Sequence, residues 1–247
     1  LQMVQQMGDL PNEGRILAQL GATCLQMGDH AQAESYLQQA MTIAEASGDK
    51  QTLGNVLMNL AIIAEESGQF TKAMAQLEWA LTIRQSVGDL YGEAGVLNNL
   101  GSIAYSMGQY DQAAAHWENS LRIAMEIGDQ AGEEMTLGNL GTIAQNKGQY
   151  DKAIAYWQRS LQICRAIGRR MGEGETLHNL GGVFYRQQKY EEAKQFYEQS
   201  LVISQETSYQ LLHGLTLSGM GALALMQSEW TQAKHLYEQS LLIHKEE

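Results

Sequence analysis

The chain has 247 residues, with 16 lysines and arginines against 28 aspartates and glutamates, which gives a formal net charge of −12. That charge opposes binding to nucleic-acid phosphates or to anionic membranes. Hydrophobic residues make up 44% of the chain and charged residues 18%, a balance that favours a folded domain over a disordered polyelectrolyte. No stretch approaches the roughly 18 apolar residues of a membrane span. Two cysteines provide no disulfide framework, so we expect a reducing, cytoplasmic setting.

Several residue types recur along the chain with a period of 40 residues. Glycines mark one position of the period, and most of them are followed by aspartate: Gly8, Gly48, Gly88, Gly128 and Gly168. Alanines mark another position: Ala33, Ala73, Ala113, Ala153, Ala193 and Ala233. The period predicts a single array over 1–247, with repeats at about 8–47, 48–87, 88–127, 128–167, 168–207 and 208–247.

Each period contains two stretches of about 16 residues with the three-and-four apolar spacing that is typical of helices. The glycines are placed to end helices in the left-handed conformation, and the aspartates after them favour the start of the next helix. Small residues such as Gly101 and Ala113 allow two helices to approach closely. We therefore predict an all-α fold of stacked helix–turn–helix hairpins, with Trp117 and Trp157 in the core and Trp79 exposed on a second helix.

The third repeat shows a fixed order of large and small residues: Leu97, Leu100, Gly101, Gly108, Tyr110, Ala113, Trp117, Ser120 and Leu121. This order resembles the tetratricopeptide repeat, and the resemblance covers essentially the whole chain. The period and the Asn-Leu-Gly core are similar to those of the LGN/Pins class of adaptors and of bacterial sensor arrays. The resemblance implies a right-handed α-solenoid of about six hairpins whose first helices line a concave face. Two departures are alanine in place of the usual mid-helix tyrosine and the absence of the proline often found at the repeat end.

The two ends of the array carry unusual apolar residues. Leu1 and Met3 align with apolar positions of later second helices, so residues 1–7 are interpreted as the end of a preceding helix in a longer array. Val202 and Leu242 occupy a column that is otherwise polar. This pattern favours a further packing element beyond the sixth repeat.

Four asparagines recur at one position of the predicted first helices: Asn59, Asn99, Asn139 and Asn179. A side-chain amide both donates and accepts hydrogen bonds, so it can pair with a peptide backbone in either direction. The resemblance implies that these asparagines hold the backbone of a bound extended peptide. The alternative is that each one ties a helix to the next through a backbone carbonyl.

Variable residues near the asparagines are candidates for selecting ligand side chains: Glu65, Asn98, Tyr105, His178, Tyr185 and Arg186. The two tyrosines are either aromatic anchors for a partner or covers for the helix pair beneath them. Arg15 and Arg186 are the only basic residues in the inner columns, and they lie far apart along the array. This argues against the clamp of lysines and arginines that holds a terminal carboxylate in the chaperone-tail subtype. With Glu65 and Glu66 near one end, the groove suits a polar or mildly basic extended segment of a protein.

The sequence contains no phosphate loop, nucleophile elbow or dinucleotide fingerprint, so we expect neither an enzyme nor a cofactor. Cys24 and Cys164 lie about seven helices apart, too far for a disulfide or a shared metal. Glu175 and His178 are interpreted as a surface pair. One basic concentration is either a docking patch for an acidic partner or solvated surface: Arg165, Arg169, Arg170, Arg186, Lys189 and Lys194.

The pattern thus predicts a non-enzymatic module that binds an extended peptide in its concave groove. One alternative is the sensor or scaffold arm of a larger regulator. Another is a structural module that associates head to tail through its two ends, through Leu1 and Leu242.

Overall fold

The computed structural model describes residues 9–246, and all secondary structure in that range is helical, which confirms the all-α prediction. The chain divides into two compact units, Leu1–Asp129 and Gln130–Glu247. The interpretation of residues 1–7 as the end of a helix, which rests on Leu1 and Met3, lies outside the described residues.

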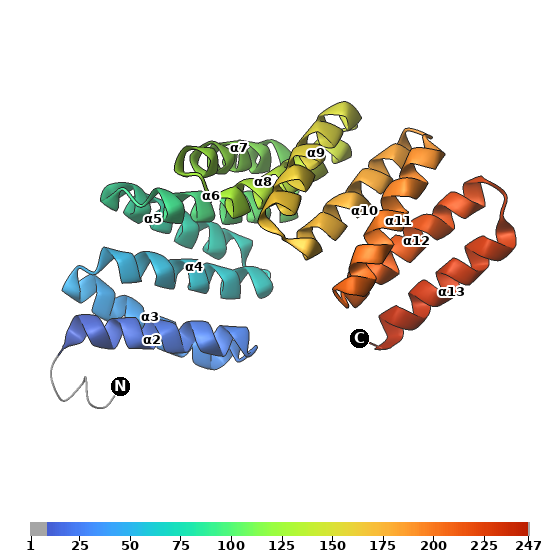
Figure 1. Cartoon of the computed structure of the whole chain (residues 1–247). Helices are drawn as coiled ribbons and strands as arrows, with labels where there is room; N and C mark the ends of the chain where they lie inside the picture. Colours follow the sequence, from blue (N-terminus) through green and yellow to red (C-terminus); the bar gives the residue numbers. More distant parts are fainter. Residues whose placement is uncertain (1–8, 247) are drawn as a thin grey trace. The chain divides into compact units, whose positions relative to one another are not determined.

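The first unit contains three helical hairpins (Figure 1), formed by α2 (Leu10–Gln26), α3 (His30–Ser47), α4 (Lys50–Glu66), α5 (Phe70–Val87), α6 (Leu90–Ser106) and α7 (Tyr110–Ile127). The second unit contains α8 (Gln130–Asn146), α9 (Tyr150–Ile167), α10 (Arg170–Arg186), α11 (Tyr190–Glu206), α12 (Gln210–Met226) and α13 (Trp230–Glu246). No helix in the described range is long and apolar enough to cross a membrane.

Each even-numbered helix packs against the odd-numbered helix that follows it, and successive hairpins in a unit meet through the second helix of one and the first helix of the next. First helices also contact one another, α2 with α4 and α10 with both α8 and α12. Residues on these pairs of first helices therefore come together. The right-handed superhelical twist stays a prediction.

The helices end and begin as the glycine and aspartate pattern predicts. Gly48 ends α3 with a φ of 70°, in the left-handed region that glycine enters at little cost. Asp49 then caps α4, because its side chain accepts the Thr52 amide at 3.1 Å. Towards the end of the chain, three other residues take a positive φ without being glycine: Gln188, Ser208 and Ser228.

The core is shared between neighbouring hairpins, as expected for units that cannot bury their apolar sides alone. One cluster joins residues of α3, α4, α5 and α6, among them Leu57, Leu77 and Leu100. In the next hairpin Gly101 leaves room for an indole, since a Cβ there would lie 2.5 Å from Nε1 of Trp117. Trp117 and Trp157 are buried, which confirms that they are core residues.

Candidate functional site

A cavity of about 430 Å³ lies in the first unit between α2 and α4. Its walls are mostly uncharged polar groups and small or flexible apolar side chains, contributed by Arg15, Ala18, Gln19, Ala22, Asp49, Gln51, Thr52, Asn55, Met58 and Asn59. Six of these residues come in three pairs 40 residues apart, Arg15 with Asn55, Ala18 with Met58 and Gln19 with Asn59. The cavity therefore lies where the repeat brings equivalent positions of two first helices together.

The four asparagines at the repeated position of the first helices are all half-buried: Asn59, Asn99, Asn139 and Asn179. In the described part of the chain, the side chains of Asn59, Asn99 and Asn179 make no hydrogen bond to another protein group. For these three residues the alternative of a tie to the next helix has no supporting contact. A half-exposed amide without a protein partner keeps its donors and its acceptor for another molecule.

Asn98 differs from its expected place on the groove wall. The residue is only 7% exposed, and its backbone carbonyl accepts hydrogen bonds from Nε1 of Trp117 at 3.0 Å and from the Ser102 hydroxyl at 3.2 Å. The large indole of the same hairpin packs against this part of α6. Asn98 therefore offers little surface to a ligand.

The two candidate tyrosines pack within their own hairpins. The ring of Tyr105 lies 5.4 Å from that of Tyr110 and 5.9 Å from that of Trp117, measured between centroids. The ring of Tyr185 lies 5.9 Å from that of Tyr190. Both candidates are half-buried, so they cover the helix pair beneath them and still present part of the ring.

His178 connects α10 to α12 through a hydrogen bond of 3.1 Å between its Nδ1 and the Thr216 hydroxyl. That hydroxyl already donates to the Leu212 carbonyl at 2.8 Å, so toward His178 it accepts, and Nδ1 carries the proton. Burial lowers the pKa of His178, which keeps the ring neutral near pH 7. The remaining ring nitrogen, Nε2, is therefore a hydrogen-bond acceptor.

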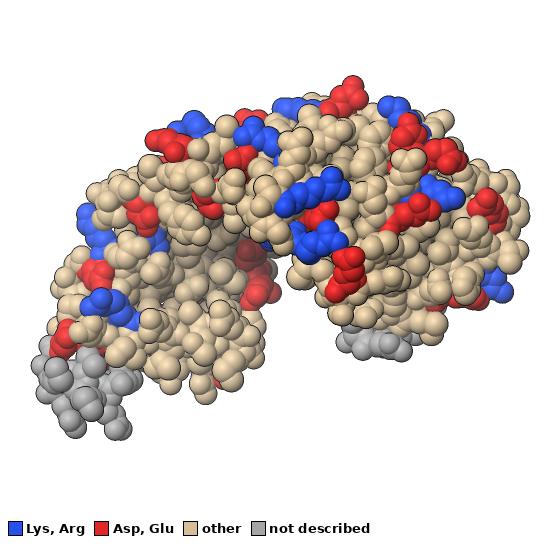
Figure 2. Space-filling model, viewed as in Figure 1, with Lys and Arg blue, Asp and Glu red and all other residues tan. Residues whose placement is uncertain are grey.

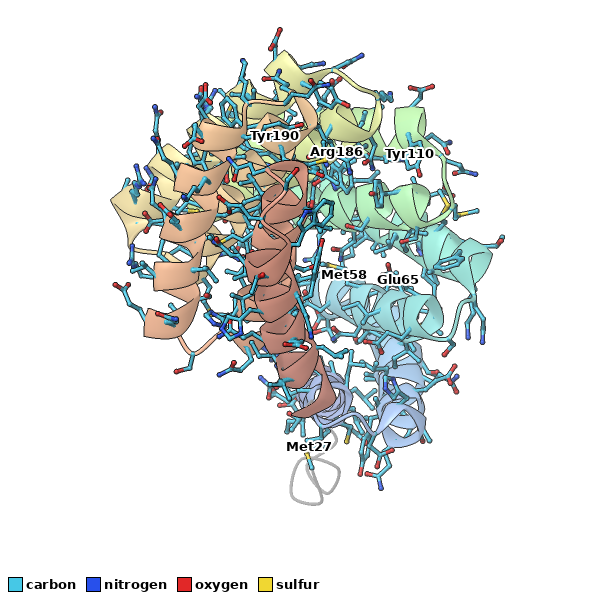
Figure 3. All side chains as sticks on the ribbon, turned by 90° about the vertical axis from the view of Figure 1, so that its right-hand side faces the viewer. Met27, Met58, Glu65, Tyr110, Arg186 and Tyr190 are labelled. Carbon is cyan, nitrogen blue, oxygen red and sulfur yellow. The ribbon has the colours of Figure 1, made fainter. Side chains whose placement is uncertain are left out.

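The charged candidates lie near the carboxyl ends of first helices. Glu65 on α4 is half-buried, and burial together with the charge of Glu66 raises its pKa. Glu66 itself lies 3.2 Å from Nδ1 of His30. Arg186 is exposed in the last turn of α10. Figure 3 shows the side chains, with Met58 and Glu65 labelled two turns apart on α4.

The sequence matches the family described as Tetratricopeptide repeat over residues 8–86, 92–145 and 132–206. The chain belongs to the tetratricopeptide repeat family. No curated protein sequence matches it at a significant level.

Solved structures share the tetratricopeptide fold of this chain at low identity. BtubC (BKLC) from P. vanneervenii has a TM-score of 0.77 and 20% identity, covering 87% of this chain and 89% of that one. PH0952 from Pyrococcus horikoshii, a signal transduction ATPase with numerous domains and a tetratricopeptide repeat sensor, has a TM-score of 0.82 and 18% identity. This chain is covered to 96% by that match but spans only 37% of PH0952. The apo form of the quorum sensor NprR from B. thuringiensis has a TM-score of 0.72 and 16% identity, covering 95% of this chain and 65% of that one.

The tetratricopeptide array contains a buried arginine next to the cavity that sequence reasoning missed. Arg84 on α5 is only 2% exposed; its Nη1 donates to Oδ2 of Asp89 at 2.8 Å and its Nη2 donates to Oδ1 of Asn55. Gly54 and Gly92 make room for it, because a Cβ at either position would lie less than 3 Å from the guanidinium or its stem. The signal was present in the sequence, since Arg84 stands in a column of small residues: Ala44, Ala124, Cys164 and Ser204.

Three of the six residues in the basic concentration on the second unit pair with acidic side chains. Arg165 donates to Glu173 at 2.8 Å, and Arg169 donates to Glu134 at 2.6 Å. Arg170 pairs with both Glu173 and Glu206. Figure 2 likewise shows basic and acidic side chains interspersed over the visible face. Arg186, Lys189 and Lys194 remain for a docking patch for an acidic partner, which stays a prediction.

Neither cysteine of the tetratricopeptide chain belongs to a chemical site. Cys24 and Cys164 are both free thiols. Burial, reinforced by the charge of Glu134, raises the pKa of Cys164 to about 12, which keeps the thiol protonated and unreactive. Within the described residues no group of histidine, cysteine and acidic side chains is arranged to hold a metal ion.

Proposed function

We propose that this tetratricopeptide chain is a non-enzymatic module that binds an extended segment of another protein along the first helices of its hairpins. Asn59 and Asn99 in the first unit, and Asn139 and Asn179 in the second, hold the backbone of that segment through their side-chain amides. The observation that carries the proposal is that the amides of Asn59, Asn99 and Asn179, at one repeated position, are half-exposed and have no protein partner in the described part of the chain.

Residues beside the amides select the side chains of the segment. Tyr105 and Tyr185 present ring surface, and His178 presents an acceptor nitrogen. Glu65 and Arg186 contribute charge. Because the chain carries a net charge of −12, we expect the bound segment to be polar or mildly basic.

A second candidate function is the sensor or scaffold arm of a larger regulator. PH0952, of which this chain spans 37%, is a multidomain ATPase with a tetratricopeptide sensor, and NprR is a quorum sensor. In that role the same inner face binds the signal, and another domain responds. The resemblance to LGN/Pins adaptors stays a prediction alongside this one.

Head-to-tail association is a third candidate. Val202 and Leu242 are exposed apolar residues on second helices of the second unit, in agreement with a surface for packing. Growth of light scattering with protein concentration, abolished by Leu242→Glu, would support association; a constant monomer mass over the same range would exclude it.

The proposal is tested by selecting peptides from a random library on the wild-type chain and on the variant Asn99→Ala/Asn139→Ala. We expect the wild type alone to yield a consensus, because the amides supply the backbone contacts. Recovery of the same consensus with both proteins would refute the role of the asparagines. Failure of both, with helical circular dichroism intact, would favour the scaffold arm.

A further inference from the structure

The buried Arg84 determines which hydrogen-bonding atom of Asn55 faces the cavity between α2 and α4. A guanidinium has donors only, so Asn55 must turn its carbonyl oxygen, Oδ1, toward Nη2 of Arg84. The Asn55 amide nitrogen is therefore left as a donor on an exposed residue that lines the cavity. The buried Arg84 thus fixes which half of the Asn55 amide a ligand meets.

The formal charges around the cavity are balanced. Arg84 is paired with Asp89 at 2.8 Å, and Nη2 of Arg15 donates to Asn12 at 2.6 Å. Asp49 accepts from both the amide and the hydroxyl of Thr52; burial opposes ionisation, but these bonds and the charge of Arg15 lower its pKa overall. Asp49 is therefore ionised at neutral pH and offsets the charge of Arg15.

The remaining groups match an uncharged ligand. Arg15 and Asp49 line the cavity with opposite charges that offset each other, so neither an ammonium group nor a carboxylate is favoured by net charge, and the Asn55 donor further disfavours an ammonium group. Asn59 offers an acceptor and a donor with no protein partner. Ala18, Ala22 and Met58 provide apolar surface for a short aliphatic stem, and about 430 Å³ lies within the range of small-ligand pockets.

We propose that this cavity is a side-chain pocket for a neutral carboxamide, a glutamine or asparagine side chain of the bound segment, with Arg84 as a positioning residue. The ligand carbonyl accepts from Asn55 and its amide nitrogen donates to Asn59. This specificity rests on the proposed function, since it names one side chain of the peptide that the inner face binds.

The test titrates the folded chain with three blocked amino acids, N-acetylglutamine methylamide and its glutamate and lysine counterparts, while amide resonances of α2 and α4 are followed by NMR. We expect the glutamine probe to bind about ten-fold more tightly than either charged probe, because a charged group would leave hydrogen bonds unmade. Equal or tighter binding of the glutamate or lysine probe would overturn the proposal.

The decisive variant is Asn55→Asp. The new carboxylate still accepts from Arg84, so the fold is retained, but the donor facing the cavity is replaced by an acceptor. We expect the glutamine probe to lose about ten-fold in affinity and the lysine probe to become the preferred one. The matched control is Asn119→Asp on α7, an exposed asparagine outside the cavity, which leaves the order of the probes unchanged. An unchanged order in Asn55→Asp would refute the assignment.

Library peptides separate the two proposals. If peptides bind but show no preference for glutamine or asparagine at any position, the pocket assignment fails and peptide binding stands. If the glutamine probe binds with the expected selectivity while no peptide is recovered, the pocket stands and peptide binding fails.

Discussion

Substituting Asp89 by asparagine removes the negative charge of this side chain and keeps its ability to accept hydrogen bonds. Asp89 caps α6 by accepting the Gly92 amide at 2.9 Å, and it accepts Nη1 of Arg84 at 2.8 Å. Asparagine is as good a helix cap as aspartate and can still accept from the guanidinium. The change therefore leaves the geometry in place and removes the charge that balances Arg84.

The expected cost follows from the burial of the pair. The Arg84 side chain is 2% exposed and that of Asp89 is 22% exposed, so the uncompensated charge in Asp89→Asn is the one that water does not reach. Breaking such a pair costs about 3–5 kcal/mol. Because a neutral hydrogen bond remains, we expect the low end, about 3 kcal/mol of unfolding free energy.

The assay is urea unfolding at pH 7 followed by circular dichroism, with hydrogen exchange to show whether the loss is confined to α4–α6. The matched control is Asp49→Asn, which alters the same cap one repeat earlier, where Ala44 stands in place of Arg84. We expect the control to lose less than about 1 kcal/mol. Equal losses in the two variants would show that Arg84 needs no counter-charge, and the reasoning would be wrong.

Three further predictions concern the second unit and the pH dependence. Arg169→Asp introduces the residue that the repeat has at Asp49 and Asp89, yet it should lower the unfolding free energy in urea by about 3 kcal/mol, because the buried Glu134 loses its counter-charge. Adding Glu134→Gly, which introduces the residue found at Gly54, should restore the stability. Failure of this second change to rescue the first would refute the reasoning. Glycine at each of the three non-glycine positions of positive φ should raise the unfolding free energy by about 1 kcal/mol, seen as a higher thermal midpoint: Gln188, Ser208 and Ser228. No gain in the midpoint would contradict the inferred backbone strain. The pKa of His178 is lowered in the folded chain, so the contribution of this residue to stability is present above the unfolded pKa near 6.5 and is lost as pH falls through the folded pKa. His178→Met should therefore flatten the decrease in unfolding free energy below pH 6.5. An unchanged slope would exclude His178 as the cause of that decrease.

The fold could be predicted because each of its determinants is local and repeated. Gly48 and Asp49 end one helix and begin the next through their own backbone preferences, and Gly101 faces Trp117 within one hairpin. Such signals return every 40 residues, so the period alone makes them visible.

The compensations between hairpins could not be predicted in the same way, since each depends on several columns at once. In the second hairpin a buried arginine, Arg84, faces Gly54 and pairs with Asp89. In the fourth hairpin the buried charge is negative and stands in another column: Glu134 takes the place of Gly54, and its partner Arg169 takes the place of Asp89. In the sequence, Arg169 is part of a basic run. The packing shows that it neutralises the buried carboxylate of Glu134.

The asparagine position lies between these cases. Its place on the first helices follows from the period, whereas the absence of protein partners for Asn59, Asn99 and Asn179 in the described chain follows only from the packing. Asn98, one residue away from Asn99, is covered because the adjacent core residue is a tryptophan.

The most direct test of the central claim is the affinity of a library-selected peptide for the wild type and for Asn59→Ala/Asn99→Ala, measured by calorimetry, with Asn119→Ala as the control. Each amide that holds the peptide backbone should contribute about ten-fold, so the double variant should bind about 100-fold more weakly while the control binds normally. Unchanged affinity in the double variant, with its helical spectrum and unfolding midpoint retained, would show that the asparagines do not hold the ligand.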